Sequence, residues 1–102
     1  MAEYLAKRSP NRCPSHPGAV LADILPETGR TKSKIAELLG ISRQHLHDIL
    51  NEKKPVSPQM AVRFGKLLGG SAETWLRLQV AYDLWHAERE TDVSHIKPLK
   101  VA

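Results

Sequence analysis

The sequence predicts an all-α protein, a bundle of five short helices followed by a short extended tail. Apolar residues recur at helical spacing in five stretches between residues 17 and 89. Each stretch begins at a serine, threonine or proline that suits a helix start, and glycine, proline or polar residues separate the stretches. A chain of 102 residues that is 41% apolar and 25% charged has the composition of one globular domain.

The first two helices are predicted on either side of a polar turn at residues 27–30. Pro17 suits the first turn of a helix and Pro26 ends it. The apolar residues of this first helix are Val20, Leu21, Ile24 and Leu25. Thr31 is placed to cap the second helix, and Gly40 to stop it in the left-handed conformation. The apolar residues of the second helix are Ile35, Ala36, Leu38 and Leu39.

The remaining three helices are also predicted from residues that suit helix starts and helix ends. Ser42 is placed to cap a short third helix that extends to about Leu50, and residues 51–57 form a polar loop. Ser57 and Pro58 form a cap and a first helical position, and two glycines end the fourth helix. Its apolar residues are Met60, Ala61, Phe64, Leu67 and Leu68. Ser71 then caps a longer fifth helix, predicted over residues 72–89.

This element order predicts three parts of the chain. Residues 1–14 are expected to form an N-terminal arm because they are polar and interrupted by Pro10 and Pro14. Residues 15–90 hold the five helices and form the domain. Residues 91–102 form a C-terminal tail, whose β-branched residues and Pro98 favour at most a short edge strand.

The positive charge is unevenly distributed along the chain. Residues 1–66 have a net charge of +5 and residues 67–102 a net charge of −1. A basic surface favours a polyanion, because each lysine or arginine placed on a phosphate releases condensed counterions. A merely solvated basic surface explains the same charge equally well. The choice between them therefore depends on the pattern of residues.

Several features favour a cytoplasmic protein. Cys13 is the one cysteine and cannot form an intrachain disulfide, which is typical of a reducing compartment. The first eleven residues lack the apolar core of a signal peptide. The chain also lacks an apolar run of the ~20 residues that span a bilayer, so we expect no membrane partner.

The segment from Thr31 to Asn51 has the pattern of a helix-turn-helix. Ala36 is small where two helices would cross closely, Gly40 makes the turn, and Ile41 is an apolar plug. This pattern, with caps on both helices and further helices around it, favours DNA binding. A helix-turn-helix shape that serves only protein interaction is the alternative.

The third predicted helix has one apolar and one polar side. At 100° per residue, the apolar side carries Leu46, Ile49 and Leu50. The opposite side carries the candidate base-reading residues Arg43, Gln44, His47 and Asp48, together with Asn51. Arg43 is suited to guanine O6 and N7, and Gln44 to adenine N6 and N7. Asp48 either accepts from cytosine N4 or orients Arg43 or Gln44, and the sequence leaves this open.

Other polar residues are placed to bind phosphates on both strands. Lys32 and Ser33 lie with backbone N–H groups at the start of the second helix. Asn51, Lys53 and Lys54 lie in the loop after the third helix and are candidates for the other strand.

The fifth predicted helix is apolar on two sides. One stripe holds Trp75, Leu78, Tyr82 and Trp85, and a second stripe holds Leu76, Val80 and Leu84. We expect the first stripe to close the core and the second to contact a second copy of the chain, since a bundle of this size has little volume to bury both. The alternative is that the bundle covers both stripes. A homodimer would place two reading helices on half-sites about 34 Å apart.

The residues do not favour an enzyme or a metalloprotein. The pair Cys13 and His16 has no second pair of zinc ligands, and His45 and His47 point in divergent directions on a helix. No glycine-rich phosphate loop is present, because Gly69 and Gly70 suit a helix end. We therefore expect no catalytic residues, no metal and no cofactor.

The chain resembles the HigA-type antitoxins, members of the Xre-like (lambda-repressor-like) helix-turn-helix proteins. The resemblance extends over residues 15–90, through His16-Pro17-Gly18, LLGISRQHLHDILNEKKPVSPQMAVR and GGSAETWLRLQVAYDLWHA. It implies a protein encoded beside a RelE-like mRNA endonuclease, which it binds and neutralises, and repression of the shared operon by a dimer bound to operator DNA. A freestanding Xre-type regulator without a toxin is the alternative.

The resemblance also implies which residues contact DNA. It assigns Arg43 and Gln44 to bases, and it assigns to phosphates Lys32, Ser42, Asn51 and Lys53. Lys32 departs from the glutamine that many Xre-type repressors have at this place, which favours a nonspecific ion pair. The arm and the tail lie outside the resemblance, and both are candidates for toxin contact.

Overall fold

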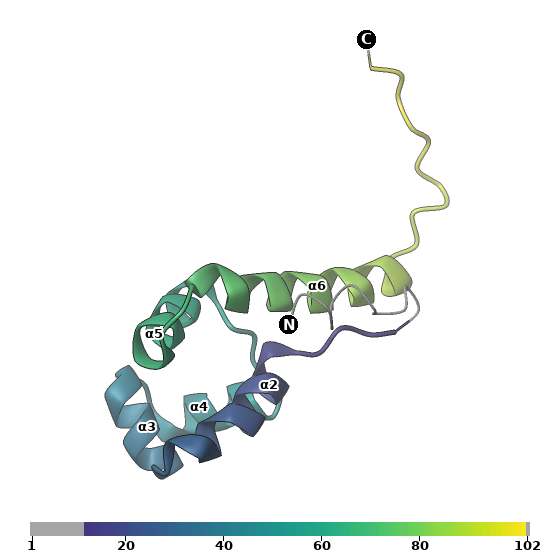
Figure 1. Ribbon diagram of the computed structural model, residues 1–102. Coiled ribbons are helices and arrows are strands. Elements are labelled where there is room, and N and C mark those ends of the chain that lie inside the picture. Colours follow the sequence, from purple (N-terminus) through teal and green to yellow (C-terminus); the bar gives the residue numbers. More distant parts are fainter. Residues whose placement is uncertain (1–11, 102) are drawn as a thin grey trace.

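The computed structural model describes residues 12–101, which form five α-helices and no strand. The elements in chain order are α2 (Pro17–Ile24), the 3-10 helix η1 (Leu25–Thr28), α3 (Lys32–Leu39), α4 (Arg43–Leu50), α5 (Pro58–Leu68) and α6 (Ala72–Glu90). The all-α prediction is confirmed. Residues 1–11 of the predicted arm lie outside the described residues. In Figure 1, α6 runs as one long rod beside the shorter helices, and the tail leads away from the bundle.

The predicted serine and threonine caps are present at four helix starts. Thr31 Oγ1 accepts a hydrogen bond from Lys34 N at 3.1 Å, and Ser42 Oγ accepts one from His45 N at 3.0 Å. Ser57 and Ser71 cap α5 and α6 in the same way. Each cap satisfies a backbone N–H that the helix itself leaves without a partner, a contribution of about 1 kcal/mol.

The start of α2 uses a cap that the sequence analysis missed. His16 is 3% exposed, and its Nδ1 accepts a hydrogen bond from Gly18 N at 2.8 Å. Gly18 lies so close to α4 that an added Cβ would overlap the carbonyl oxygen of Ile49. The His-Pro-Gly sequence therefore caps α2 and lets it pack directly on α4. The helix ends at Ile24, and the chain continues as η1 rather than stopping at Pro26.

The turn between α3 and α4 forms as predicted. Gly40 has a φ of 74°, in the left-handed region that glycine tolerates, and Ile41 N donates to Ala36 O at 3.0 Å. Ala36 is 2% exposed, as its position between two helices requires. The buried core contains Leu21, Leu25, Ile35, Ala36, Leu39, Leu46, Ile49, Leu50, Val56, Met60, Ala61, Phe64 and Trp75.

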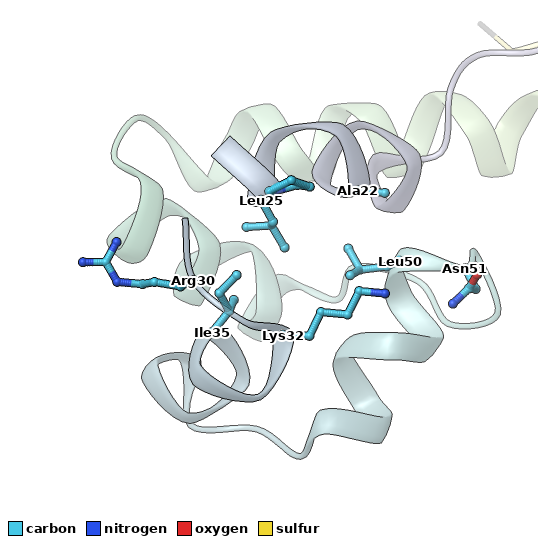
Figure 2. A pocket seen from close by; sticks show the side chains of 8 residues that line it. Ala22, Leu25, Arg30, Lys32, Ile35, Leu50 and Asn51 are labelled. Atoms are coloured by element: carbon cyan, nitrogen blue, oxygen red, sulfur yellow. The ribbon is translucent and has the colours of Figure 1, made fainter. Parts of the chain in front are cut away.

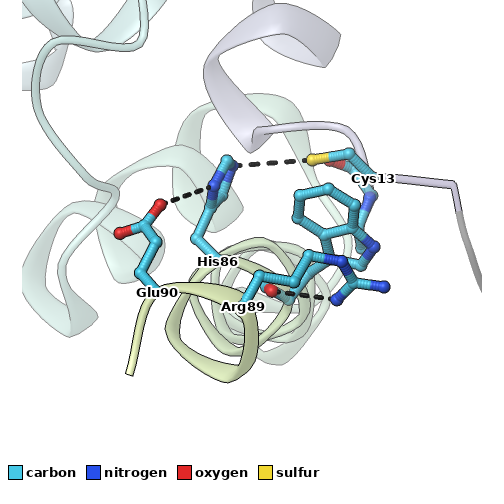
Figure 3. Close-up of polar contacts among 6 residues, drawn as sticks. Cys13, His86, Arg89 and Glu90 are labelled. Atoms are coloured by element: carbon cyan, nitrogen blue, oxygen red, sulfur yellow. Dashed lines mark hydrogen bonds and ion pairs between the residues drawn. The ribbon is translucent and has the colours of Figure 1, made fainter. Parts of the chain in front are cut away.

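Gln79 and His86 attach α6 to the rest of the domain through polar contacts. Gln79 is 5% exposed, and its Oε1 accepts a hydrogen bond from Val56 N at 2.7 Å. In Figure 3, the Cys13 side chain points at His86, with Sγ 3.6 Å from Nε2. The other ring nitrogen of His86 lies 3.3 Å from Glu90 Oε2. The extended segment before α2 is thereby held against the second half of α6.

The tail after α6 does not form the short edge strand considered from the sequence. Residues 91–101 are extended chain with one turn, closed by a 3.0 Å hydrogen bond from Ile96 N to Val93 O. No other part of the described chain is a strand with which the tail could pair. Within residues 12–101, no helix combines the length and the apolar character needed to cross a bilayer.

Candidate DNA-binding surface

Helix α4 is fixed by its apolar side and presents its polar side outward. Leu46 and Ile49 are fully buried and Leu50 is 8% exposed. Arg43, Gln44 and His47 are exposed and line one shallow hollow on the outer face of the helix. The predicted separation of the two sides is confirmed. Because the buried side holds the helix in place, long polar side chains project from a rigid base.

Asp48 differs from the other predicted base-reading residues because its side chain is only 16% exposed. Its Oδ1 accepts a hydrogen bond from Gln44 Nε2 at 2.8 Å, and its Oδ2 lies 3.8 Å from Lys54 Nζ. Asp48 therefore contacts one predicted base-reading residue and one predicted phosphate-binding residue.

The loop after α4 is folded back on the end of that helix. The backbone N–H groups of Lys53 and Lys54 donate to Asp48 O, at 2.8 and 3.2 Å. Glu52 has a φ of 62°, an uncommon value for a residue with a side chain, and it turns the loop. Asn51 Nδ2 donates to His47 O at 2.9 Å, so part of the amide's hydrogen-bonding capacity is used within the helix end. The side chains of Lys53 and Lys54 are exposed beside α4.

A pocket is lined by residues of α2, η1, α3 and the end of α4. Figure 2 shows Lys32, from the first turn of α3, extending toward Asn51 at the end of α4. Leu25, Ile35 and Leu50 form apolar walls. The structure thus places Lys32 and Asn51, two predicted phosphate-binding residues, in one pocket that opens beside the N-terminus of α3.

The other predicted phosphate-binding residues lie at helix starts. Ser33 is exposed in the first turn of α3, outside the pocket. Ser42 is exposed, and because its Oγ accepts the capping hydrogen bond, its hydroxyl hydrogen can still be donated outward. Arg30, which the sequence analysis did not single out, also lines the pocket beside Lys32. Its position directly before the Thr31 cap is the signal that could have identified it.

The two apolar stripes of α6 have different environments. Trp75 is 8% exposed and belongs to the core, whereas Val80 and Leu84 are 60% and 54% exposed. Leu76, the third residue of the stripe predicted to contact a second copy, is partly buried against the core and is less accessible than the other two. The physical reason is its position near the start of α6, where α5 packs closely against the helix. Val80 and Leu84 are left as an apolar surface that residues 12–101 do not cover.

No metal-binding cluster occurs in the described part of the chain. Among residues 12–101, no three histidine, cysteine or carboxylate side chains are close enough to hold a metal ion. His16 has a capping role, and burial lowers its pKa below the ordinary value, although the carboxylates of Glu52 and Asp83 act in the opposite direction.

Comparisons with known proteins agree with the helix-turn-helix fold. The helix-turn-helix family profile matches residues 25–75. Antitoxin HigA-1 of Vibrio cholerae is 30% identical over 98 residues, which are 93% of this chain and 92% of that protein. YddM of Escherichia coli K12, an uncharacterised helix-turn-helix-type transcriptional regulator, is 30% identical over 83 residues, which are 81% of this chain and 88% of that protein.

A solved structure extends the similarity to three dimensions. The structure of antitoxin GraA in complex with its operator has a TM-score of 0.79 and 32% identity to this chain. It covers 93% of this chain, and this chain covers 99% of it. The sequence profile, the HigA-1 alignment and the shared fold agree, and this chain therefore belongs to the helix-turn-helix family of DNA-binding proteins, as a HigA-type antitoxin-like member.

Proposed function

We propose that this chain binds operator DNA as a homodimer with α4 in the major groove, represses its own operon, and neutralises a toxin encoded beside it. The observation that carries the DNA-binding part is the exposure of Arg43, Gln44 and His47 on a helix whose opposite side is buried. Side chains on such a helix reach base edges without any rearrangement of the core.

The charges around α4 support contact with the DNA backbone. Lys32 and Arg30 line the pocket at the end of α4, and Lys53 and Lys54 are exposed in the loop that follows this helix. These basic side chains suit contact with phosphates beside the groove that Arg43 and Gln44 would read. The N-terminus of α3 adds partial positive charge beside the pocket, and Ser33 and Ser42 add hydroxyl donors.

The homodimer is proposed from α6. Val80 and Leu84 are one helical turn apart, and both are more than half exposed, whereas Trp75 and Gln79 on the same helix are buried. A second copy that packs its own α6 on this surface would bury both pairs, and a twofold axis there would direct two α4 helices to successive turns of one duplex.

The toxin partner is proposed from the relatives. Antitoxin HigA-1 and antitoxin GraA are named for toxin neutralisation, and we propose a RelE-like mRNA endonuclease as the toxin of this chain. The C-terminal tail is the candidate contact within the described residues, because Val93, Ile96 and Leu99 are all exposed there.

The test is co-expression of the chain with the adjacent reading frame, followed by co-purification and a footprint on the upstream DNA. The proposal predicts a stable complex of the two proteins and a protected inverted repeat. A footprint without a co-purifying neighbour would instead support the second candidate, a freestanding regulator, which the similarity to the transcriptional regulator YddM favours. Absence of both would refute the proposal.

A further inference from the structure

Asp48 and Gln44 form a polar pair on α4, one helical turn apart. Gln44 Nε2 lies 2.8 Å from Asp48 Oδ1, a good hydrogen-bond distance. The second carboxylate oxygen of Asp48 lies 3.8 Å from Lys54 Nζ. The side chain of Asp48 is 16% exposed, whereas Gln44 and Lys54 are exposed. Both oxygens of this carboxylate therefore have partners within the chain before any DNA is bound.

An ionised carboxylate fixes the orientation of the Gln44 amide. A carboxylate only accepts hydrogen bonds, so the amide must turn its nitrogen toward Asp48. Rotating the amide by half a turn would place Oε1 against a carboxylate oxygen, and two acceptors would repel each other. Gln44 is thus held with Oε1 and the second N–H of Nε2 available for another partner. An acceptor beside a donor is the pair that adenine N6 and N7 require in the major groove.

The same carboxylate opposes sequence-independent DNA binding. A negative charge beside the groove repels phosphates, and an ion pair with Lys54 reduces the positive charge that Lys54 offers to the DNA backbone. A surface that only binds phosphates gains nothing from this carboxylate. A surface that reads sequence becomes more specific for two reasons: its affinity for random DNA falls, and the orientation of Gln44 is fixed.

We infer that Asp48 is a positioning residue that determines specificity: it orients the Gln44 amide for adenine and lowers the affinity for random DNA. This inference rests on the DNA binding proposed above. It replaces the assignment of Asp48 as a base-reading residue, since a side chain that is mostly buried, with both oxygens engaged by Gln44 and Lys54, is poorly placed to accept from cytosine N4.

Two substitutions separate the two effects of Asp48. Asp48→Asn removes the charge but keeps an oxygen that accepts from Gln44 Nε2, whereas Asp48→Ala removes both the charge and the acceptor. Glu37→Gln is the matched control, because it also removes one carboxylate from the helix-turn-helix, where Glu37 is exposed and pairs with Lys34 at 3.6 Å. Circular dichroism shows whether each variant is folded.

The experiment measures binding of each variant to the operator, to operators with every single base-pair change, and to random DNA at several salt concentrations. Gln44→Ala identifies the base pair whose preference depends on Gln44. At that base pair, Asp48→Ala should lose about 5-fold or more of the preference for A·T, and Asp48→Asn should keep it. Both variants should bind random DNA more tightly. The plot of log affinity against log salt concentration should become steeper, by up to the amount expected for about one additional phosphate contact. Glu37→Gln should leave the base preference unchanged.

Results that contradict the proposed function differ from results that contradict only the role of Asp48. If wild-type protein binds no upstream DNA, the proposed function fails and the inference fails with it. If wild-type protein binds and Gln44→Ala alters a base preference that Asp48→Ala leaves intact, the inference alone is wrong. A preference for C·G that disappears in Asp48→Ala would show direct reading of cytosine and would likewise overturn the positioning role.

Discussion

Replacing Val80 and Leu84 with glutamate tests the homodimer that the proposed function requires. About half of each side chain is exposed in the single chain. Full burial of a valine or leucine is worth about 1.5 to 3 kcal/mol, so covering the remaining half contributes about 1 kcal/mol per residue. A twofold dimer buries both residues of both subunits, so the two substitutions together should weaken the dimer by about 4 kcal/mol. This corresponds to roughly a thousandfold increase in the dimer dissociation constant.

Sedimentation equilibrium measures this change directly. We expect the double variant Val80→Glu, Leu84→Glu to sediment as a folded monomer at concentrations where the wild type is a dimer. Leu76 is left unchanged because it packs partly against the core, and a charge there would threaten folding. Val62→Glu is the matched control, since Val62 is 62% exposed on α5 and lies outside the proposed interface. An unaltered dimer in the double variant, or an equal loss in Val62→Glu, would refute the α6 interface.

Two further predictions concern stability. Leu46→Ala should lower the free energy of unfolding by about 2 to 5 kcal/mol, because Leu46 is fully buried and truncation leaves a cavity; urea denaturation measures it, and a loss below 1 kcal/mol would contradict the packing. Burial lowers the pKa of His16, so the unfolded chain binds more protons there and stability should fall as the pH drops through about 6.5. His16→Asn keeps a cap acceptor for Gly18 N and should flatten this part of the pH profile; an unchanged profile would show that other groups cause it.

The sequence predicted those features whose causes are local. A serine or threonine cap involves only a backbone N–H two or three residues later, so Thr31, Ser42 and Ser57 could each be identified from a few neighbouring residues. The two faces of α4 followed from helical periodicity alone, because Leu46 and Ile49 fall on one side and Arg43 on the other.

Features that depend on contacts between distant segments could not be predicted in this way. Residue 18 must be glycine because a Cβ there would overlap the carbonyl oxygen of Ile49. No sequence pattern near Gly18 indicates that Ile49 lies beside it. Gln79 interrupts the apolar stripes of α6, and its burial makes sense only once Val56 N is seen to donate to it. The Gln44–Asp48 hydrogen bond joins two residues of one helix, but the sequence left the role of Asp48 open, and side-chain geometry was needed to identify this contact.

The most direct test of the DNA-binding surface compares Arg43→Ala with Lys53→Ala. Both side chains are exposed and lie away from the core, so neither substitution should unfold the domain. Gel shifts at one salt concentration measure affinity for the operator and for random DNA. We predict that Arg43→Ala loses about 1 to 3 kcal/mol on the operator and little on random DNA, whereas Lys53→Ala loses similar amounts on both. An equal loss on the two DNAs for Arg43→Ala would contradict base reading by α4.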